Sequence, residues 1–100
     1  MIPEADIHPL ASRELEKAAL FYDHRLPGLG KRFLRHVEQA IEQILLFPEA
    51  CPVAGRTVRM KTLDRFPYSL FYLFENNAIF FVAVAHQKQE PMYWADRLPR

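Results

Sequence analysis

The residues of this sequence best suited to chemistry lie in its second half. Arg59 and Lys61 stand two positions apart in "TVRMKTL", and Arg65 follows in "DRFP". These cations can hold a phosphate group. His86 ends an apolar run, and its reference pKa near neutrality makes it the natural candidate for accepting or donating a proton. Tyr93, in the polar tail that follows, can stack on a base or donate a proton.

Each of these residues also has an ordinary structural interpretation. Basic side chains are common on the solvated face of a strand, where they also resist edge pairing. His86 can end its strand with its ring hydrogen-bonded to a turn, and Lys88 can be a solvated residue of the tail. Tyr93 and Trp94 can cap the sheet, because such rings bury well with one polar atom outside. The segment "AVAHQKQEPMYW" (residues 83–94) is therefore either a reactive site or the end of a strand.

Length and composition limit the classes of protein that fit. One hundred residues, half of them hydrophobic and 13% aromatic, predict a single domain over residues 1–100 with a substantial core. The 13 basic and 12 acidic residues give a net charge of +1, which argues against a protein that grips nucleic acid without regard to sequence. A chain with this apolar content is not disordered.

Several kinds of site and compartment are not expected. The single cysteine, Cys51, excludes an internal disulfide and a cysteine-based zinc site, and the four histidines are scattered. No glycine loop suited to phosphate is found, so we expect no metal and no cofactor. The N-terminus has no secretory pattern and the run "AIFFVAVA" is too short to span a bilayer, so we expect a cytoplasmic protein without a membrane partner.

The first half of the chain has helical periodicity. Residues 4–8 are expected to form a short strand, and apolar residues at spacings of three and four predict a helix over roughly 9–26. "LPGLG" ends that helix. A second helix follows from about residue 30 to 47, with Phe33, Val37 and Ile44 in its apolar stripe and Arg32 and Arg35 facing water. Together these predict an αα-hairpin over about 9–47.

The second half changes to strand periodicity. In "TVRMKTL" the basic residues alternate with apolar ones, which predicts one wet and one buried face. "YSLFYLF" and "IFFVAVA" are apolar strands joined at Asn76–Asn77, so a meander is expected over about 57–86, with a tail at 87–100. Because so apolar a sheet cannot stay bare, the helices must cover one face. The predicted fold is α+β, ordered β-α-α-β-β-β, with an antiparallel sheet packed on an αα-hairpin.

Four segments in this order carry a family resemblance. "PGLGKRF", "FPEACP", "RFPYSLFY" and "AVAHQKQEPMYW", within residues 10–96, resemble the ParE/RelE family of small bacterial toxins. The resemblance implies a type II toxin–antitoxin system associated with growth inhibition and plasmid stabilisation. It also implies a cognate antitoxin that neutralises the toxin in a hetero-oligomer. We expect such a partner to cover the apolar groove between sheet and helices, or to add a strand to an open edge.

The resemblance leaves the target open between two branches. ParE-like members bind DNA gyrase and do no chemistry; RelE-like members are endoribonucleases that cleave mRNA on the ribosome. In a RelE-like protein Arg59, Lys61 and Arg65 would hold phosphate, with His86 and Tyr93 as acid and base. Target or RNA contacts would come from the same cations and from Lys88, Tyr93 and Trp94. Gln87 and Gln89 reduce the basicity of the tail and favour the ParE-like interpretation, and an inactive relative that only binds a partner is a third possibility.

Overall fold

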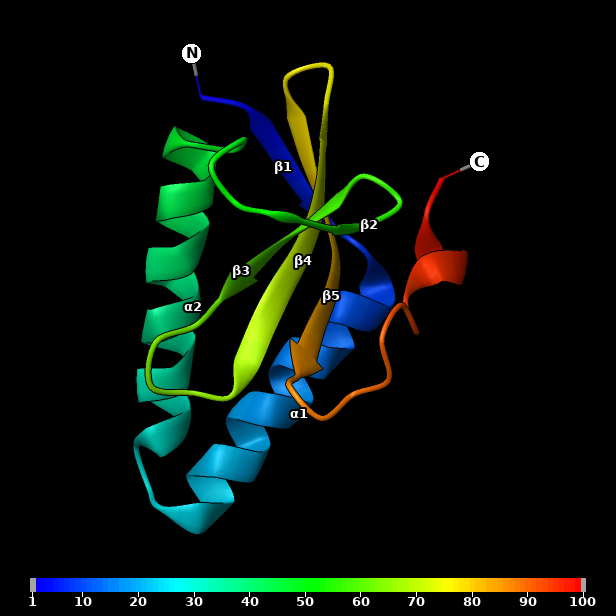
Figure 1. Ribbon diagram of the computed structural model, residues 1–100. Coiled ribbons are helices and arrows are strands. Elements are labelled where there is room, and N and C mark those ends of the chain that lie inside the picture. The colour runs from blue at the N-terminus through cyan, green and yellow to red at the C-terminus, as the bar shows by residue number, and fades with distance from the viewer. Residues whose placement is uncertain (1, 100) are drawn as a thin grey trace.

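The computed structural model describes residues 2–99, so both ends of the expected domain 1–100 lie outside the described residues. The elements follow one another in the order β-α-α-β-β-β-β, with a short 3₁₀ turn near the C-terminus (Figure 1). They are β1 (Glu4–Ile7), α1 (Pro9–Arg25), α2 (Leu29–Leu46), β2 (Val53–Gly55), β3 (Val58–Thr62), β4 (Tyr68–Glu75), β5 (Ala78–His86) and η1 (Ala95–Arg97). No helix among residues 2–99 is long and apolar enough to cross a membrane.

The strands form one five-stranded sheet in the order β1-β5-β4-β3-β2. β3, β4 and β5 are the predicted antiparallel meander, and the α+β class is confirmed. The sheet is mixed rather than wholly antiparallel, because β1 pairs with β5 in parallel after the chain has crossed over through both helices. β2 was not predicted, since three residues are too few to show an alternating pattern. It pairs with β3 across a tight turn in which Arg56 and Thr57 have positive φ.

Local signals fix where the two helices begin and how closely they meet. The His8 Nδ1 accepts a hydrogen bond from the Leu10 amide (3.0 Å), which caps α1. At the joint, the Asp23 carboxylate accepts from the amides of Gly28 (3.1 Å) and Gly30 (3.0 Å). A Cβ at Gly30 would lie 2.5 Å from the Ala19 carbonyl oxygen, so only glycine lets α2 approach α1 this closely.

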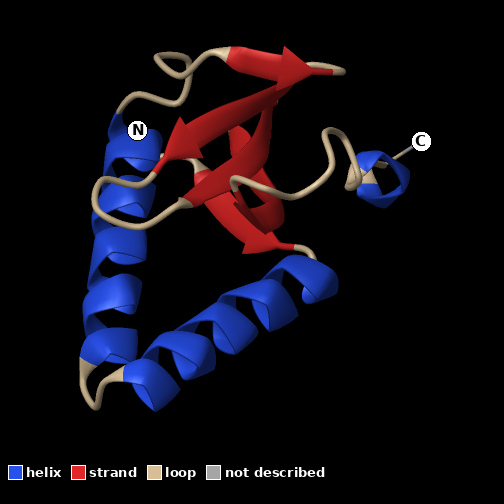
Figure 2. Ribbon diagram, turned by 60° about the horizontal axis from the view of Figure 1, so that its bottom comes forward, coloured by secondary structure: helices blue, strands red, loops and turns tan. Residues whose placement is uncertain are grey.

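Each face of the sheet is covered by a different part of the chain. The helices meet in a V against one face (Figure 2), where Phe33 and Ile44 of α2 are buried in the same core as Tyr72 and Phe81 of the sheet. The C-terminal segment covers part of the other face, where Trp94 is 1% exposed and lies 5.6 Å from the ring of Phe71. The tail therefore contributes a core residue, Trp94, to the fold.

Candidate functional site

Arg59 and Lys61 lie on the helix-covered side of β3. Arg59 is opposite Tyr72 in the β3–β4 register, and its Nη1 donates hydrogen bonds to the carbonyl oxygens of Glu49 (3.0 Å) and Cys51 (2.7 Å). Lys61 borders a cavity of about 220 Å³ beside His36 of α2. The expectation that these side chains share an open, wet face is therefore wrong, since both are half-buried against the helical layer.

His86 lies at the end of β5, where it closes a turn. Its Nδ1 accepts a hydrogen bond from the amide of Lys88 (3.0 Å), and its ring stands edge-on to that of Tyr68 at 5.2 Å. Lys88 itself is exposed. His86 and Tyr93 border the same two cavities, one of about 320 Å³ over the sheet and one of about 330 Å³ beside α1. These two predicted catalytic residues therefore lie close enough to share a cavity.

Tyr93 is held by a half-buried carboxylate of α1, that of Glu14. Its hydroxyl donates to Glu14 Oε2 (2.7 Å), and Glu14 Oε1 also accepts from the amide of Val84 (3.0 Å). Burial and this hydrogen bond raise the pKa of the Tyr93 phenol far above its usual range. Burial alone would raise the pKa of Glu14, but the hydrogen bonds from Arg97, Tyr93 and Val84 outweigh it and lower that pKa. Tyr93 is consequently a poor proton donor at neutral pH.

The C-terminal segment also contributes Arg97, which forms an ion pair with Glu14. Sequence reasoning missed both residues of this pair, because nothing local links positions so far apart. The same segment buries Trp94, so its ring is not available at the surface. The predicted site residues are thus divided between the two faces of the sheet.

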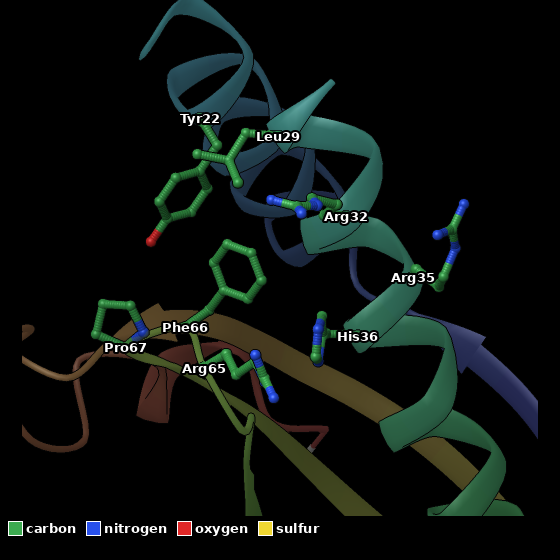
Figure 3. Close-up of a pocket in the computed structure, with 8 residues that line it drawn as sticks. All are labelled: Tyr22, Leu29, Arg32, Arg35, His36, Arg65, Phe66 and Pro67. Atoms are coloured by element: carbon green, nitrogen blue, oxygen red, sulfur yellow. The ribbon is translucent and has the colours of Figure 1, made fainter. Parts of the chain in front are cut away.

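A cavity of about 690 Å³ lies between the helical hairpin and the β3–β4 connection (Figure 3). Arg65 is the one sequence-predicted site residue that lines it. We call this cavity the arginine pocket; its lining residues are Tyr22, Leu29, Arg32, Arg35, His36, Arg65, Phe66 and Pro67. Arg32 and Arg35 are exposed, as expected for the solvated face of α2, and both border this pocket.

Aromatic rings form the floor of the arginine pocket. Phe66 stands edge-on to Tyr22 (4.9 Å between ring centroids), to Phe33 (5.3 Å) and to His36 (5.3 Å). In Figure 3, Arg32 and His36 point toward the cavity from α2 and Arg65 approaches from the opposite wall, whereas the head of Arg35 turns away. Glu14–Arg97 is the one ion pair among residues 2–99, so no carboxylate neutralises these guanidinium groups.

Comparison with known proteins gives one family and a matching fold. Residues 5–91 match the family model described as "ParE toxin of type II toxin-antitoxin system, parDE". A chain of a solved structure titled "Chromosomal ParDE TA system from P. aeruginosa" is similar, with a TM-score of 0.63 and 18% identity over 85% of this chain and 96% of that one. At that identity the likeness shows the fold alone. A search among curated proteins gave no match.

Proposed function

Because the chain belongs to the ParE toxin family of type II toxin–antitoxin systems, we propose that it inhibits growth by binding a protein target such as DNA gyrase. In this proposal a cognate antitoxin neutralises it in a hetero-oligomeric complex. The toxin acts in the cytoplasm and needs no cofactor, because binding alone produces the effect. The family model supports the toxin assignment, and the target is inferred from the state of the site residues.

The predicted catalytic groups lie apart from one another, and this separation supports a protein target over RNA. Cleavage of RNA through the ribose 2′-OH needs a base, an acid and cations that converge on one phosphate. Here the guanidinium of Arg59 donates to two backbone carbonyls of the loop between α2 and β2. The hydroxyl of Tyr93 donates to Glu14. Both groups are engaged in structural hydrogen bonds, which supports a toxin that binds rather than cleaves.

A RelE-like mRNA endonuclease is the second candidate function. It is favoured by the cavities that His86 and Tyr93 border together, with Lys88 exposed nearby. For this function the hydrogen bond from Tyr93 to Glu14 would have to open. An inactive relative that only binds a partner is the remaining alternative.

Exposed apolar side chains support the proposed antitoxin complex. Leu20, Phe21 and Leu26, around the end of α1, are 61%, 50% and 54% exposed. A partner protein that covers such residues removes apolar area from water, which stabilises a long-lived complex. The unpaired edges of β1 and β2 are further places where a partner strand can add.

Two assays on the purified protein test the target. We expect the chain to trap gyrase–DNA cleavage complexes and to leave mRNA intact in a translation-coupled assay. Cleavage of mRNA that is lost in Arg65→Ala and His86→Ala would instead support the endonuclease. If neither assay responds, and expression without the neighbouring small gene is harmless, the chain is an inactive relative.

A further inference from the structure

We propose that the arginine pocket is the docking site for an acidic segment of the cognate antitoxin, in which carboxylates flank one apolar side chain. This inference rests on the proposed function, because it assumes that an antitoxin exists. It goes beyond it by assigning the surface and the chemistry of the segment that binds there.

The floor of the pocket suits an apolar side chain. Leu29, Phe66 and Pro67 line it together with the ring of Tyr22, and Phe66 is only half-buried. The cavity, at about 690 Å³, is large enough to hold a leucine or phenylalanine side chain with its neighbouring backbone. Covering these rings removes apolar area from water, so the floor favours an apolar anchor over a fully polar ligand.

The walls of the pocket suit carboxylates. Arg32 from α2 and Arg65 from the β3–β4 connection approach the cavity from opposite sides (Figure 3). Among residues 2–99 neither forms an ion pair with a carboxylate. A guanidinium binds a carboxylate through two parallel hydrogen bonds, and such pairs become stronger when an apolar partner excludes water. One acidic residue on each side of the apolar anchor would form an ion pair with Arg32 and another with Arg65.

The rest of the chain argues for an acidic protein segment rather than nucleic acid. The net charge is only +1, so the pocket is a local positive site on a nearly neutral molecule. A polyanion is held mainly through many phosphate contacts, for which a basic excess is needed. A single apolar anchor with two flanking charges needs only this one site.

The position of the pocket argues that its occupant is the antitoxin. The pocket opens between helices and sheet, beside the joint in which Leu26 is 54% exposed. A segment seated in it can continue over Leu26 in the joint between the helices, which joins the charged site to an exposed apolar residue. That combination of charge and apolar area suits an inhibitor that must stay bound.

The experiment measures the affinity of the small protein encoded beside this gene for the toxin, by calorimetry at low and high salt. We expect Arg32→Glu/Arg65→Glu to weaken binding by about 100-fold at low salt, because each reversed charge removes a pair and adds repulsion. Arg13→Glu/Lys31→Glu is the matched control: it also reverses two charges, on exposed residues of α1 and α2 that lie outside the pocket. Arg35→Glu should have a smaller effect, since its head turns away from the cavity.

A charge swap supplies the second measurement. Replacing an acidic residue of the antitoxin by arginine should raise its affinity for the Arg32→Glu/Arg65→Glu toxin. The same replacement should weaken its binding to the unmodified toxin. Circular dichroism verifies that each variant is folded. Equal affinity of Arg32→Glu/Arg65→Glu and Arg13→Glu/Lys31→Glu would overturn the pocket assignment while leaving the antitoxin pairing intact. Loss of binding to a 12-nucleotide single-stranded RNA, with antitoxin binding unchanged, would show a nucleic-acid site and would also overturn it. If the unmodified toxin fails to bind the neighbouring protein, the proposed function itself fails.

Discussion

Arg97 forms a bidentate ion pair with Glu14, 83 positions away in the sequence: Nη1 lies 2.9 Å from Oε1 and Nη2 lies 2.9 Å from Oε2. Arg97 Nη1 also donates to the carbonyl of Val82 (3.1 Å). The pair therefore joins the C-terminal segment to α1 and to the strand between them. Paired guanidinium–carboxylate geometry of this kind is both stronger and more specific than a single hydrogen bond.

Replacing Glu14 by glutamine should destabilise the fold. The substitution removes the charge that compensates Arg97, whose side chain is 11% exposed, and weakens the bond to Tyr93. We expect the free energy of unfolding to fall by about 2–4 kcal/mol, because a largely buried cation is left without its partner. Urea denaturation measures this. Glu16→Gln, on an exposed position of the same helix, is the control and should change stability by less than about 0.5 kcal/mol.

Stability should also depend on pH through Glu14. Its pKa is lowered in the folded protein below the usual value of 4.5, so the unfolded chain binds the proton more readily. The contribution of Glu14 is then complete above pH 4.5 and is lost as the pH falls through the lower pKa of the folded state. Unfolding free energies of the wild type and of Glu14→Gln can be measured at constant salt between about pH 3 and pH 6. The difference between the two proteins should become smaller toward the acid end of this range. Parallel curves would contradict this.

Arg59 should contribute to stability rather than to chemistry. Arg59→Met removes two hydrogen bonds to the loop carbonyls of Glu49 and Cys51. We expect a loss of about 1–2 kcal/mol in unfolding free energy, since those carbonyls lose a charged donor. Lys61, two residues along the same strand, makes no such hydrogen bond among the residues that the structure describes. Lys61→Met should therefore leave the unfolding free energy nearly unchanged. Equal effects of the two substitutions would contradict the structural role of Arg59.

Trp94 should behave as a core residue. It is 1% exposed and packs on the ring of Phe71 against Val58, Leu73 and Val82. Trp94→Ala should cost about 3–5 kcal/mol of unfolding free energy, the range for removing a large buried ring. Thermal denaturation compares it with Glu90→Ala, an exposed position of the same tail. A folded, stable Trp94→Ala protein that fails only to bind its target would show that the ring has a recognition role instead.

Local patterns sufficed to predict both helices, the three-stranded meander and the α+β class. Apolar residues at helical spacing placed α1 and α2 to within a residue or two, and "LPGLG" placed the joint. The aromatic strand and Asn76–Asn77 placed the β4–β5 hairpin. These predictions were correct because periodicity and turn chemistry act over a few neighbouring residues. β2 and the parallel pairing of β1 lacked such a signal.

The sequence by itself determined the helices, the meander and the family resemblance. Only the tertiary structure decided which side chains meet. Arg59 donates a hydrogen bond to a loop carbonyl, Tyr93 donates one to Glu14, and Trp94 is buried. The residues of the expected site are therefore separated. The tertiary structure also brought Arg32 and Arg65 to opposite walls of one aromatic-floored pocket. The physical reason is that alternation shows which residues share a face of a strand, whereas packing of distant segments decides what covers that face.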